Sequence, residues 1–203
     1  MSTPSHYEKA ETKFNLLPYA SNVGSPVIVV EDTLSPDTPD SIFPNNWIST
    51  HKTGTVCLYP MFAPNRREER REDVIVQLEH EARFSIQNIV DFTEFELHNR
   101  FLEGTGSMVL DRINRKAYAA ISSRTDETAL LHFCQELDYE PVAFSAMQSA
   151  EGKRHPIYHT NVMMSIGSGF CAICLSSIDD VEEREAVQQE IESNGLEIIA
   201  LSE

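Results

Sequence analysis

The sequence predicts a mixed α+β fold built from a repeated hairpin–helix–strand unit. Three stretches of the 203-residue chain share one order of patterns: a polar segment, two short apolar strands joined by a tight turn, a charged helical run and one further strand. The turns contain Gly or Asn, as tight hairpins favour, and the repeat recurs at roughly 55 to 60 residues, a longer period than most solenoid repeats have. A chain of this length has room for one sizeable core, so we expect a single domain over residues 1–203.

The three units are predicted over residues 45–91, 103–147 and 157–203. Helices are expected to begin near Asn65, Asp126 and Asp180, residue types that cap helix N-termini, and the last should end at Asn194-Gly195. Runs of apolar and β-branched residues place the strands. The expected strands are 47–50, 55–59 and 85–90, then 107–112, 117–121 and 141–147, then 162–166, 170–175 and 196–201.

Outside these units the patterns are weaker. Apolar residues at helical spacing between positions 7 and 17 predict a helix, and 26–30 a short strand, so residues 1–30 are interpreted as the tail of an incomplete unit. Residues 31–44, with three prolines, are expected to be a loop of the length that often carries function. Residues 149–156 are expected to be a polar loop. The alternating arginines and glutamates of 66–72 predict a solvated helix face with ion pairs within the helix.

The charge balance limits the classes of partner. The chain has 16 Lys and Arg against 32 Asp and Glu, a formal charge of −16. Nucleic acids and anionic membranes need a basic surface, so we expect neither as a partner, whereas a small cationic or zwitterionic substrate is compatible. No stretch reaches the length of a transmembrane helix, and the N-terminus lacks the pattern of a signal peptide, so a cytoplasmic location is expected.

The four cysteines lie inside apolar patterns, as reduced, buried cysteines do. Cys171 and Cys174 are three residues apart in a predicted strand, so they point to opposite faces and are not expected to chelate a metal. No phosphate-binding or dinucleotide-binding glycine motif is present in the sequence.

The candidates for chemistry are polar residues just before the first strand of each unit. If the units pack around an axis, these positions converge, which would bring Glu103, His159 and the Asn45 region together. His159 is the candidate acid–base group, although a histidine alone more often has a structural role. Glu103 at the equivalent position favours catalysis, because a carboxylate that orients an imidazole recurs in nucleophilic catalysis. Asn46 and His51 add polar contacts for a ligand.

Four motifs in this order and spacing resemble the arginine-deiminase-related family, also called the amidinotransferase or citrulline-utilisation hydrolase family, of the guanidino-group-modifying or pentein superfamily. The motifs are Phe43-Pro44-Asn45-Asn46-Trp47-Ile48-Ser49-Thr50-His51, Tyr59-Pro60-Met61 with Asn65-Arg66-Arg67, Glu103-Gly104-Thr105-Gly106-Ser107, and Tyr158-His159-Thr160-Asn161-Val162-Met163-Met164.

The resemblance implies a five-bladed β/α-propeller of ββαβ units around a central active site. It implies that a cysteine thiolate attacks a guanidino or ureido carbon of an arginine- or citrulline-like substrate, with His159 as the proton shuttle and Glu103 as the orienting carboxylate. Asn45, Asn46, His51 and Asn161 would contact the substrate, and no metal or organic cofactor is implied. Relatives often have aspartate at the positions of His51 and Asn161, which leaves the identity of the substrate open.

The family's nucleophilic cysteine lies in a glycine-rich motif of the last blade, and this sequence has no such motif. We therefore expect about three and a half of five blades, with no nucleophile among Cys57, Cys134, Cys171 and Cys174. Two interpretations follow: a hydrolase-type or amidinotransferase-type protein, or a non-catalytic fragment or binding protein derived from one. Open strand edges would favour self-association.

Overall fold

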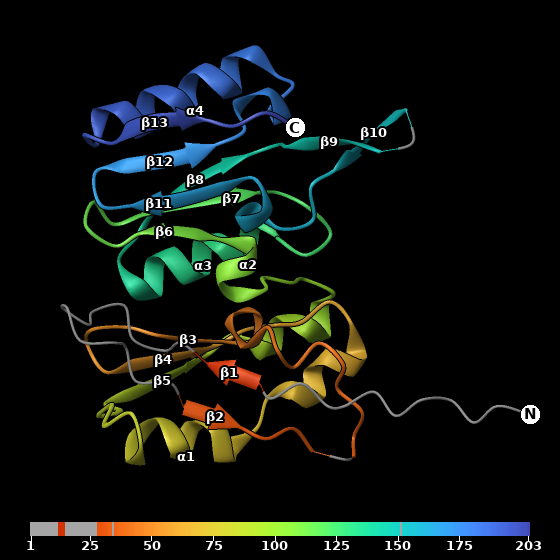
Figure 1. Cartoon of the computed structure of the whole chain (residues 1–203), viewed down its shortest axis with the longest axis vertical. Coiled ribbons are helices and arrows are strands. Elements are labelled where there is room, and N and C mark those ends of the chain that lie inside the picture. Colours follow the sequence, from red (N-terminus) through yellow and green to blue (C-terminus); the bar gives the residue numbers. More distant parts are fainter. Residues whose placement is uncertain (1–11, 15–27, 34, 151) are drawn as a thin grey trace, which may run out of the picture.

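The computed structural model describes residues 12–14, 28–33, 35–150 and 152–203 as a mixed α+β fold with three three-stranded sheets (Figure 1). The sheets have the strand orders β3-β4-β5, β6-β7-β8 and β11-β12-β13. In each, the first two strands are antiparallel, and the third is parallel to the second. A parallel pair needs a crossover connection, and each crossover here contains a helix.

The first sheet consists of β3 (Ile48–Thr50), β4 (Thr55–Leu58) and β5 (Asn88–Asp91). Its third strand begins three residues later than the sequence predicts, because residues 85–87 still belong to the connection from the helix.

The crossover of the first sheet is not the single helix predicted from Asn65. A 3₁₀ helix, η2 (Pro64–Glu69), is followed by the α-helix α1 (Glu72–His80). Arg70 and Arg71 between them have extended backbone angles, which break the helix. Pro64 opens η2 because its ring presets the helical φ, so Asn65 caps nothing.

The second sheet consists of β6 (Val109–Asp111), β7 (Lys116–Ala120) and β8 (Glu140–Phe144). Its helix is α3 (Glu127–Leu137), and Asp126 accepts a hydrogen bond from Ala129 N at 3.0 Å as the predicted N-cap. The 3₁₀ helix η3 (Thr93–His98) lies in the connection from the first sheet.

The third sheet consists of β11 (Met164–Gly167), β12 (Phe170–Ile173) and β13 (Glu197–Ala200). Its crossover contains the 3₁₀ helix η5 (Leu175–Ser177) and the α-helix α4 (Val181–Ser193). The predicted caps of α4 are confirmed: Asp180 accepts from Glu183 N at 2.9 Å, and Gly195 follows the helix with a φ of +74°.

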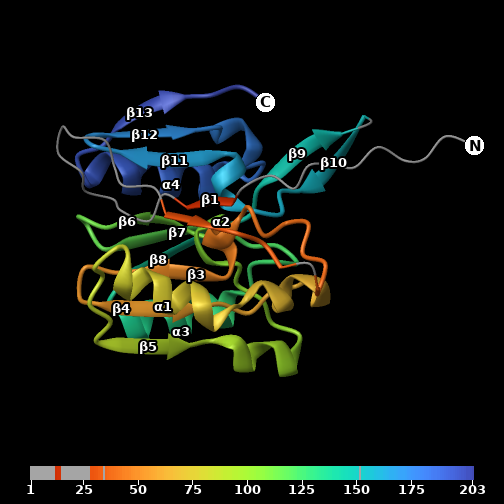
Figure 2. The ribbon, with the colours of Figure 1, turned by 60° about the horizontal axis from the view of Figure 1, so that its bottom comes forward.

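Two predictions outside the sheets are wrong. Residues 12–14 of the helix expected between positions 7 and 17 form a strand, β1 (Thr12–Phe14), which pairs with β2 (Ile28–Val30). The rest of that expected helix lies outside the described residues. The expected polar loop at 149–156 belongs to a hairpin of β9 (Met147–Ala150) and β10 (Lys153–Pro156), which projects from the sheets in Figures 1 and 2. Gly152 has a φ of +73°, a conformation that suits a tight hairpin turn.

Three apolar clusters hold the sheets together. One joins α1 to the first sheet, with Trp47 and Leu78 at its centre. The second joins the first and second sheets through Tyr59 and Phe133. The third joins the second and third sheets through Tyr118 and residues of α4. Because two clusters span neighbouring sheets, residues of different units are held in fixed relation. In the described part of the chain, no helix is long and apolar enough to cross a membrane.

Candidate functional site

Three helical turns meet at one end of the sheets. They are the 3₁₀ helix η1 (Pro44–Asn46), the one-turn helix α2 (Gly104–Ser107) and the 3₁₀ helix η4 (Thr160–Val162). Each precedes the first strand of its sheet, and α2 packs against both of the others. The predicted convergence of these three positions is confirmed.

Glu103 and His159 form the centre of this site. Although they are 56 residues apart in sequence, His159 Nε2 lies 2.6 Å from Glu103 Oε2. The side chain of His159 is 8% exposed and that of Glu103 is 0% exposed. The expected contact between the carboxylate and the imidazole is therefore confirmed.

Glu103 is held as a carboxylate. Burial raises the pKa of the Glu103 carboxyl, but hydrogen bonds from His159 and the Phe62 N–H, with the charge of Arg124, bring it below its usual value. Phe62 N donates to Oε1 at 3.0 Å, and Arg124 Nη1 donates to Oε2 at 3.3 Å. An ionised carboxylate only accepts hydrogen bonds, so His159 Nε2 carries the proton between them. The other ring nitrogen, Nδ1, has no hydrogen bond to a described residue and lies beside Gly106.

Gly106 allows α2 to pack directly against the imidazole. A Cβ at this position would lie 2.4 Å from Asn46 Nδ2 and 3.0 Å from His159 Nδ1. These separations are shorter than ordinary contacts of a methyl group, so a larger residue would displace the Asn46 amide or the imidazole. Thr160 fixes the same junction, since its Oγ1 donates to Ser107 O at 2.6 Å. The imidazole is thus positioned by α2 and η4 together.

A cavity of about 360 Å³ opens beside the pair. His159 lines it together with Asn45, Asn46 and Asn161, three of the residues predicted to contact a substrate. Glu103 is fully buried and does not line it. The other lining residues are Asp40, Phe43, Arg66, Arg124, Tyr158 and Val162.

His51 does not belong to this cavity, contrary to the prediction. Asn46 precedes β3 and His51 follows it. Because a strand advances by about 3.3 Å per residue, the two residues lie at opposite ends of this strand. His51 lines a second cavity instead, together with Arg112. The two ends of the segment from Asn45 to His51 therefore line two different cavities.

The sequence matches, over residues 4–203, the family described as N,N dimethylarginine dimethylhydrolase, eukaryotic. The chain belongs to this family. The resemblance to the guanidino-modifying pentein superfamily, predicted from the motifs, is thereby confirmed. No individually curated protein matches the sequence.

The fold of this chain is similar to that of solved structures of other proteins. The product-bound N-terminal domain of ArgZ, an arginine dihydrolase from the ornithine-ammonia cycle in Cyanobacteria, is 18% identical with a TM-score of 0.58, covering 79% of this chain and 53% of that chain. AgrE in ternary complex with ornithine and NAD+ is 17% identical with a TM-score of 0.59, covering 81% of this chain and 22% of that chain. The chain thus spans about half the length of the ArgZ domain.

Arg66 lines the cavity at His159, a position that the sequence did not predict for it. It forms a two-pronged ion pair with Glu69, from Nε and Nη2 at 2.8 and 2.9 Å, and its Nη1 donates to Asn46 Oδ1 at 2.9 Å. Arg66 and Glu69 are 4% and 3% exposed, so the predicted solvated face is wrong here. The alternating charges gave no signal of this, because a buried pair and a solvated pair look alike in sequence. Arg66 fixes the amide of Asn46 at the cavity wall.

Arg124 is the second missed residue. Its guanidinium lies 5.7 Å from the centre of the Phe62 ring and 5.4 Å from that of Tyr158, and it reaches Glu103 at 3.3 Å. It therefore places a positive charge between the buried carboxylate and the cavity. Nothing in its local sequence pattern distinguishes it from the chain's other arginines.

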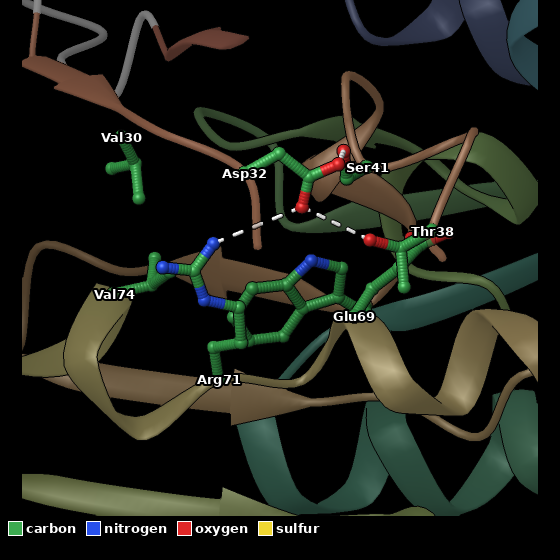
Figure 3. Close-up of a pocket in the computed structure, with 8 residues that line it drawn as sticks. Val30, Asp32, Thr38, Ser41, Glu69, Arg71 and Val74 are labelled. Atoms are coloured by element: carbon green, nitrogen blue, oxygen red, sulfur yellow. Dashed lines mark hydrogen bonds and ion pairs between the residues drawn. The ribbon is translucent and has the colours of Figure 1, made fainter. Parts of the chain in front are cut away.

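The predicted loop at 31–44 forms part of the cavity wall and is anchored at its start. The Asp32 carboxylate accepts hydrogen bonds at 3.0 Å from both Thr38 Oγ1 and Ser41 Oγ, and lies 3.9 Å from Arg71 Nη1 (Figure 3). These contacts surround a small cavity at Trp47, separate from the one at His159. A loop tied down in this way presents its later residues to the site in a fixed position.

None of the four cysteines lines the cavity at His159. All four are free and buried. Burial raises the pKa of the Cys57 and Cys134 thiols to about 12, and that of Cys171 to about 11. A buried neutral thiol is a poor nucleophile. Within the described residues, no group of three or more His, Cys, Asp or Glu side chains is arranged to hold a metal ion.

Proposed function

We propose that this chain supplies the substrate cavity and the acid–base pair of a hydrolase that cleaves a C–N bond at the guanidino or ureido carbon of an arginine- or citrulline-like amino acid. The observation that carries the proposal is the 2.6 Å contact between His159 and the buried carboxylate of Glu103, beside a polar cavity. The family's description makes N,N-dimethylarginine the first substrate to test.

The proposed chemistry has two steps. A thiolate attacks the guanidino carbon, the C–N bond to the leaving amine breaks, and protonated His159 gives its proton to that amine. Water then gives a proton to His159 and adds to the same carbon, the C–S bond breaks, and the ureido product leaves as the remaining proton passes to solvent. Ionised Glu103 stabilises the imidazolium that is present before the first step and forms again when water gives up its proton in the second. An acceptor amine in place of water would make the same site an amidinotransferase.

In this proposal the thiolate comes from outside these 203 residues. The support is the environment of the four cysteines, which are buried and lie away from the cavity. Guanidinium carbons are resonance-stabilised, and general acid–base help alone supplies only about 10²- to 10⁴-fold. A nucleophile is therefore required that this chain's own thiols do not provide.

Recognition of the substrate is assigned to the polar residues of the cavity wall. Asn45, Asn46 and Asn161 would accept and donate hydrogen bonds to the amino-acid part of the substrate. Asp40, which lines the same cavity, offers a carboxylate for its cationic end. Arg124 would face the substrate's carboxylate.

The same proposal covers architecture and setting. The three sheets correspond to three blades of a five-bladed propeller, and the β1–β2 pair to part of another, giving about three and a half. Four free cysteines are consistent with a reducing cytoplasm. Exposed strand edges would favour self-association.

The second candidate function is a non-catalytic binding protein that keeps the cavity. The buried state of the four cysteines favours it, because the chain would then bind an arginine-like ligand without turnover. Both candidates predict ligand binding at His159. They differ in whether added thiol-bearing sequence restores hydrolysis.

The test measures binding of arginine, citrulline and N,N-dimethylarginine to the 203-residue chain by calorimetry, and release of ammonia or dimethylamine over long incubation. We expect weak binding, lost in Glu103→Gln and His159→Gln, and no turnover. Arg100→Gln, at an exposed position that does not line the cavity, is the matched control.

Two outcomes would overturn parts of this proposal. If both site variants bind the ligands as tightly as the parent, the cavity at His159 is not the binding site. Turnover that Cys→Ser at position 57, 134, 171 or 174 abolishes would show that the nucleophile lies within this chain. Hydrolysis gained only when a Cys-bearing segment is added to the chain would favour the enzyme over the binding protein.

A further inference from the structure

A second cavity, of about 370 Å³, is lined by the turn after β3, the turn after β6 and the C-terminal end of α3. In Figures 1 and 2 these two turns lie at the left-hand end of their strands, whereas α2 lies to the right. The second cavity therefore lies at the opposite end of β3 and β6 from the site at His159.

The wall of this cavity gathers positive charge in an acidic chain. Lys52, Arg112 and Arg115 all line it, although the chain has only 16 Lys and Arg against 32 Asp and Glu. Of the carboxylates in the described residues, none lies within 4.0 Å of a nitrogen of Arg112. Its Nη1 makes only long contacts, 3.4 Å to Thr50 O and 3.5 Å to His51 Nδ1. Arg112 thus keeps hydrogen-bond donors for an anion.

Arg115 is held in place in the cavity wall, and it compensates the partial negative charge at the C-terminal end of α3. It donates to Leu137 O and, at 2.9 Å, to Asp138 O, and its guanidinium lies 3.9 Å from the centre of the Tyr139 ring. These carbonyls end α3, where the helix dipole is negative and would repel an anion. With Arg115 bound to them, the helix end is neutralised and the cavity retains its positive character.

The ionisation of His51 is consistent with this positive field. Burial and the charges of Arg112 and Arg115 lower its pKa to about 4. Arg112 can only donate, so His51 Nδ1 accepts, and Nε2 donates to Ser49 Oγ at 3.0 Å. His51 is therefore a neutral part of the wall at physiological pH, and the charge of the cavity comes from the lysine and the arginines.

We propose that this cavity binds a small organic or inorganic anion through a carboxylate or phosphate group. The planar guanidinium of Arg112 would donate hydrogen bonds to two oxygens of the group, and Lys52 would add a positive charge. Glu136 and Asp138 line the same cavity. They oppose polyanions, so the ligand is small and carries its charge on one inserted group.

The experiment titrates the 203-residue chain with succinate and with inorganic phosphate at constant ionic strength, using chloride as the reference anion. Calorimetry gives the affinity, and backbone amide NMR gives the location. We expect saturable binding of at least one anion, with the largest shifts in residues 52–55 and 112–115. Binding of succinate alone identifies a carboxylate ligand, and binding of phosphate alone a phosphate ligand.

Three variants make the test specific. Arg112→Gln should weaken binding by about tenfold or more, because a hydrogen bond to a charged group contributes about 1.5–3 kcal/mol. Arg100→Gln removes the same charge at an exposed position that does not line this cavity and should change affinity less than about twofold. Asp138→Asn should strengthen binding about two- to threefold by removing an opposing charge.

The proposal is overturned if neither anion binds saturably, or if the amide shifts fall outside the two turns. Equal losses in Arg112→Gln and Arg100→Gln would show general charge attraction only. If Arg112→Gln does not fold, Asp138→Asn still decides, since unchanged affinity in that variant contradicts binding in this cavity.

Discussion

Two histidines at opposite ends of the sheets have opposite electrostatic surroundings. His159 donates Nε2–H to the buried carboxylate of Glu103 at 2.6 Å, and its second nitrogen lies beside Gly106. His51 donates to a serine hydroxyl, and its second nitrogen faces Arg112. A carboxylate favours the imidazolium, whereas arginines oppose it. The two rings are therefore buried beside charges of opposite sign, and His51 is held neutral.

The protonation of a buried histidine depends on the charge of the groups beside it. Both residues are buried: His159 is 6% exposed and His51 is 5% exposed. Each lies close to the first strand of its unit, His159 before β11 and His51 directly after β3. Burial and position in the repeat therefore do not distinguish them. The distinguishing groups, Glu103 and Arg112, come from the neighbouring unit in each case.

The largest expected effect concerns the thiol of Cys57. Cys57 pairs across β3 and β4 with Ser49, the hydroxyl partner of His51, and its pKa is raised to about 12 by burial. Its thiolate fraction at pH 8 should be lower than that of an ordinary cysteine by about 10³-fold, and alkylation by iodoacetamide correspondingly slower. Mass spectrometry of labelled native and urea-unfolded chain checks this. Ser193→Cys, exposed on α4, is the reference thiol. Fast labelling of native Cys57 would mean that the His51 end can activate a thiol.

Next comes the loss of the buried carboxylate. Glu103→Ala removes the partner of His159, Arg124 and the Phe62 N–H, and we expect the free energy of unfolding to fall by about 3 kcal/mol or more. Glu136→Ala, an exposed carboxylate at the other cavity, should change it by less than about 0.5 kcal/mol. Urea denaturation measures both. If both variants lose the same free energy of unfolding, the contacts of Glu103 contribute no more to stability than an exposed carboxylate does.

A smaller effect is expected in the pH dependence of stability. The folded pKa of His51 is about 4, and the unfolded value is about 6.5. Between these values the unfolded chain binds a proton that the folded chain does not, so stability falls as pH drops through this window. We expect His51→Gln to lose about 2–3 kcal/mol less than the parent between pH 7 and pH 4.

Urea denaturation at several pH values measures this difference, and parallel curves for parent and variant would contradict it. NMR titration of the imidazole supplies an independent check. Arg112→Gln should raise the pKa of His51, because the positive charge of Arg112 disfavours the imidazolium.

The smallest effect tests how tightly the His159 end is packed. In an ordinary helix, Gly→Ala stabilises by about 0.5–1 kcal/mol. We expect Gly106→Ala instead to destabilise by about 1–2 kcal/mol, because its Cβ would lie 2.4 Å from Asn46 Nδ2. Thr105→Ala, one residue earlier on the same helical turn, is the control. Thermal unfolding measures both, and a stabilised Gly106→Ala would show that the imidazole is loosely held.

The elements that sequence analysis located well have local causes. Asp126 and Asp180 cap their helices as expected, and three hairpins with crossover strands follow from alternation and turn residues. Glu103 and His159 were found because equivalent positions in repeated units face the same end. The failures have non-local causes: residues 12–14 became a strand by pairing with β2, and β9–β10 pairs polar strands that carry no apolar alternation.

By itself, the sequence determined the repeat, the N-caps of α3 and α4, and the motifs of the guanidino-modifying superfamily. It also determined the two residues that meet between the units, Glu103 and His159. Only the tertiary structure decided that Arg66 is buried against Glu69, that Arg124 reaches Glu103, and that His51 faces a separate basic cavity. The physical reason is the range of the interactions. Periodicity and capping depend on residues within a few positions, whereas burial, ion pairing and the direction of a strand end depend on packing between units far apart in the chain.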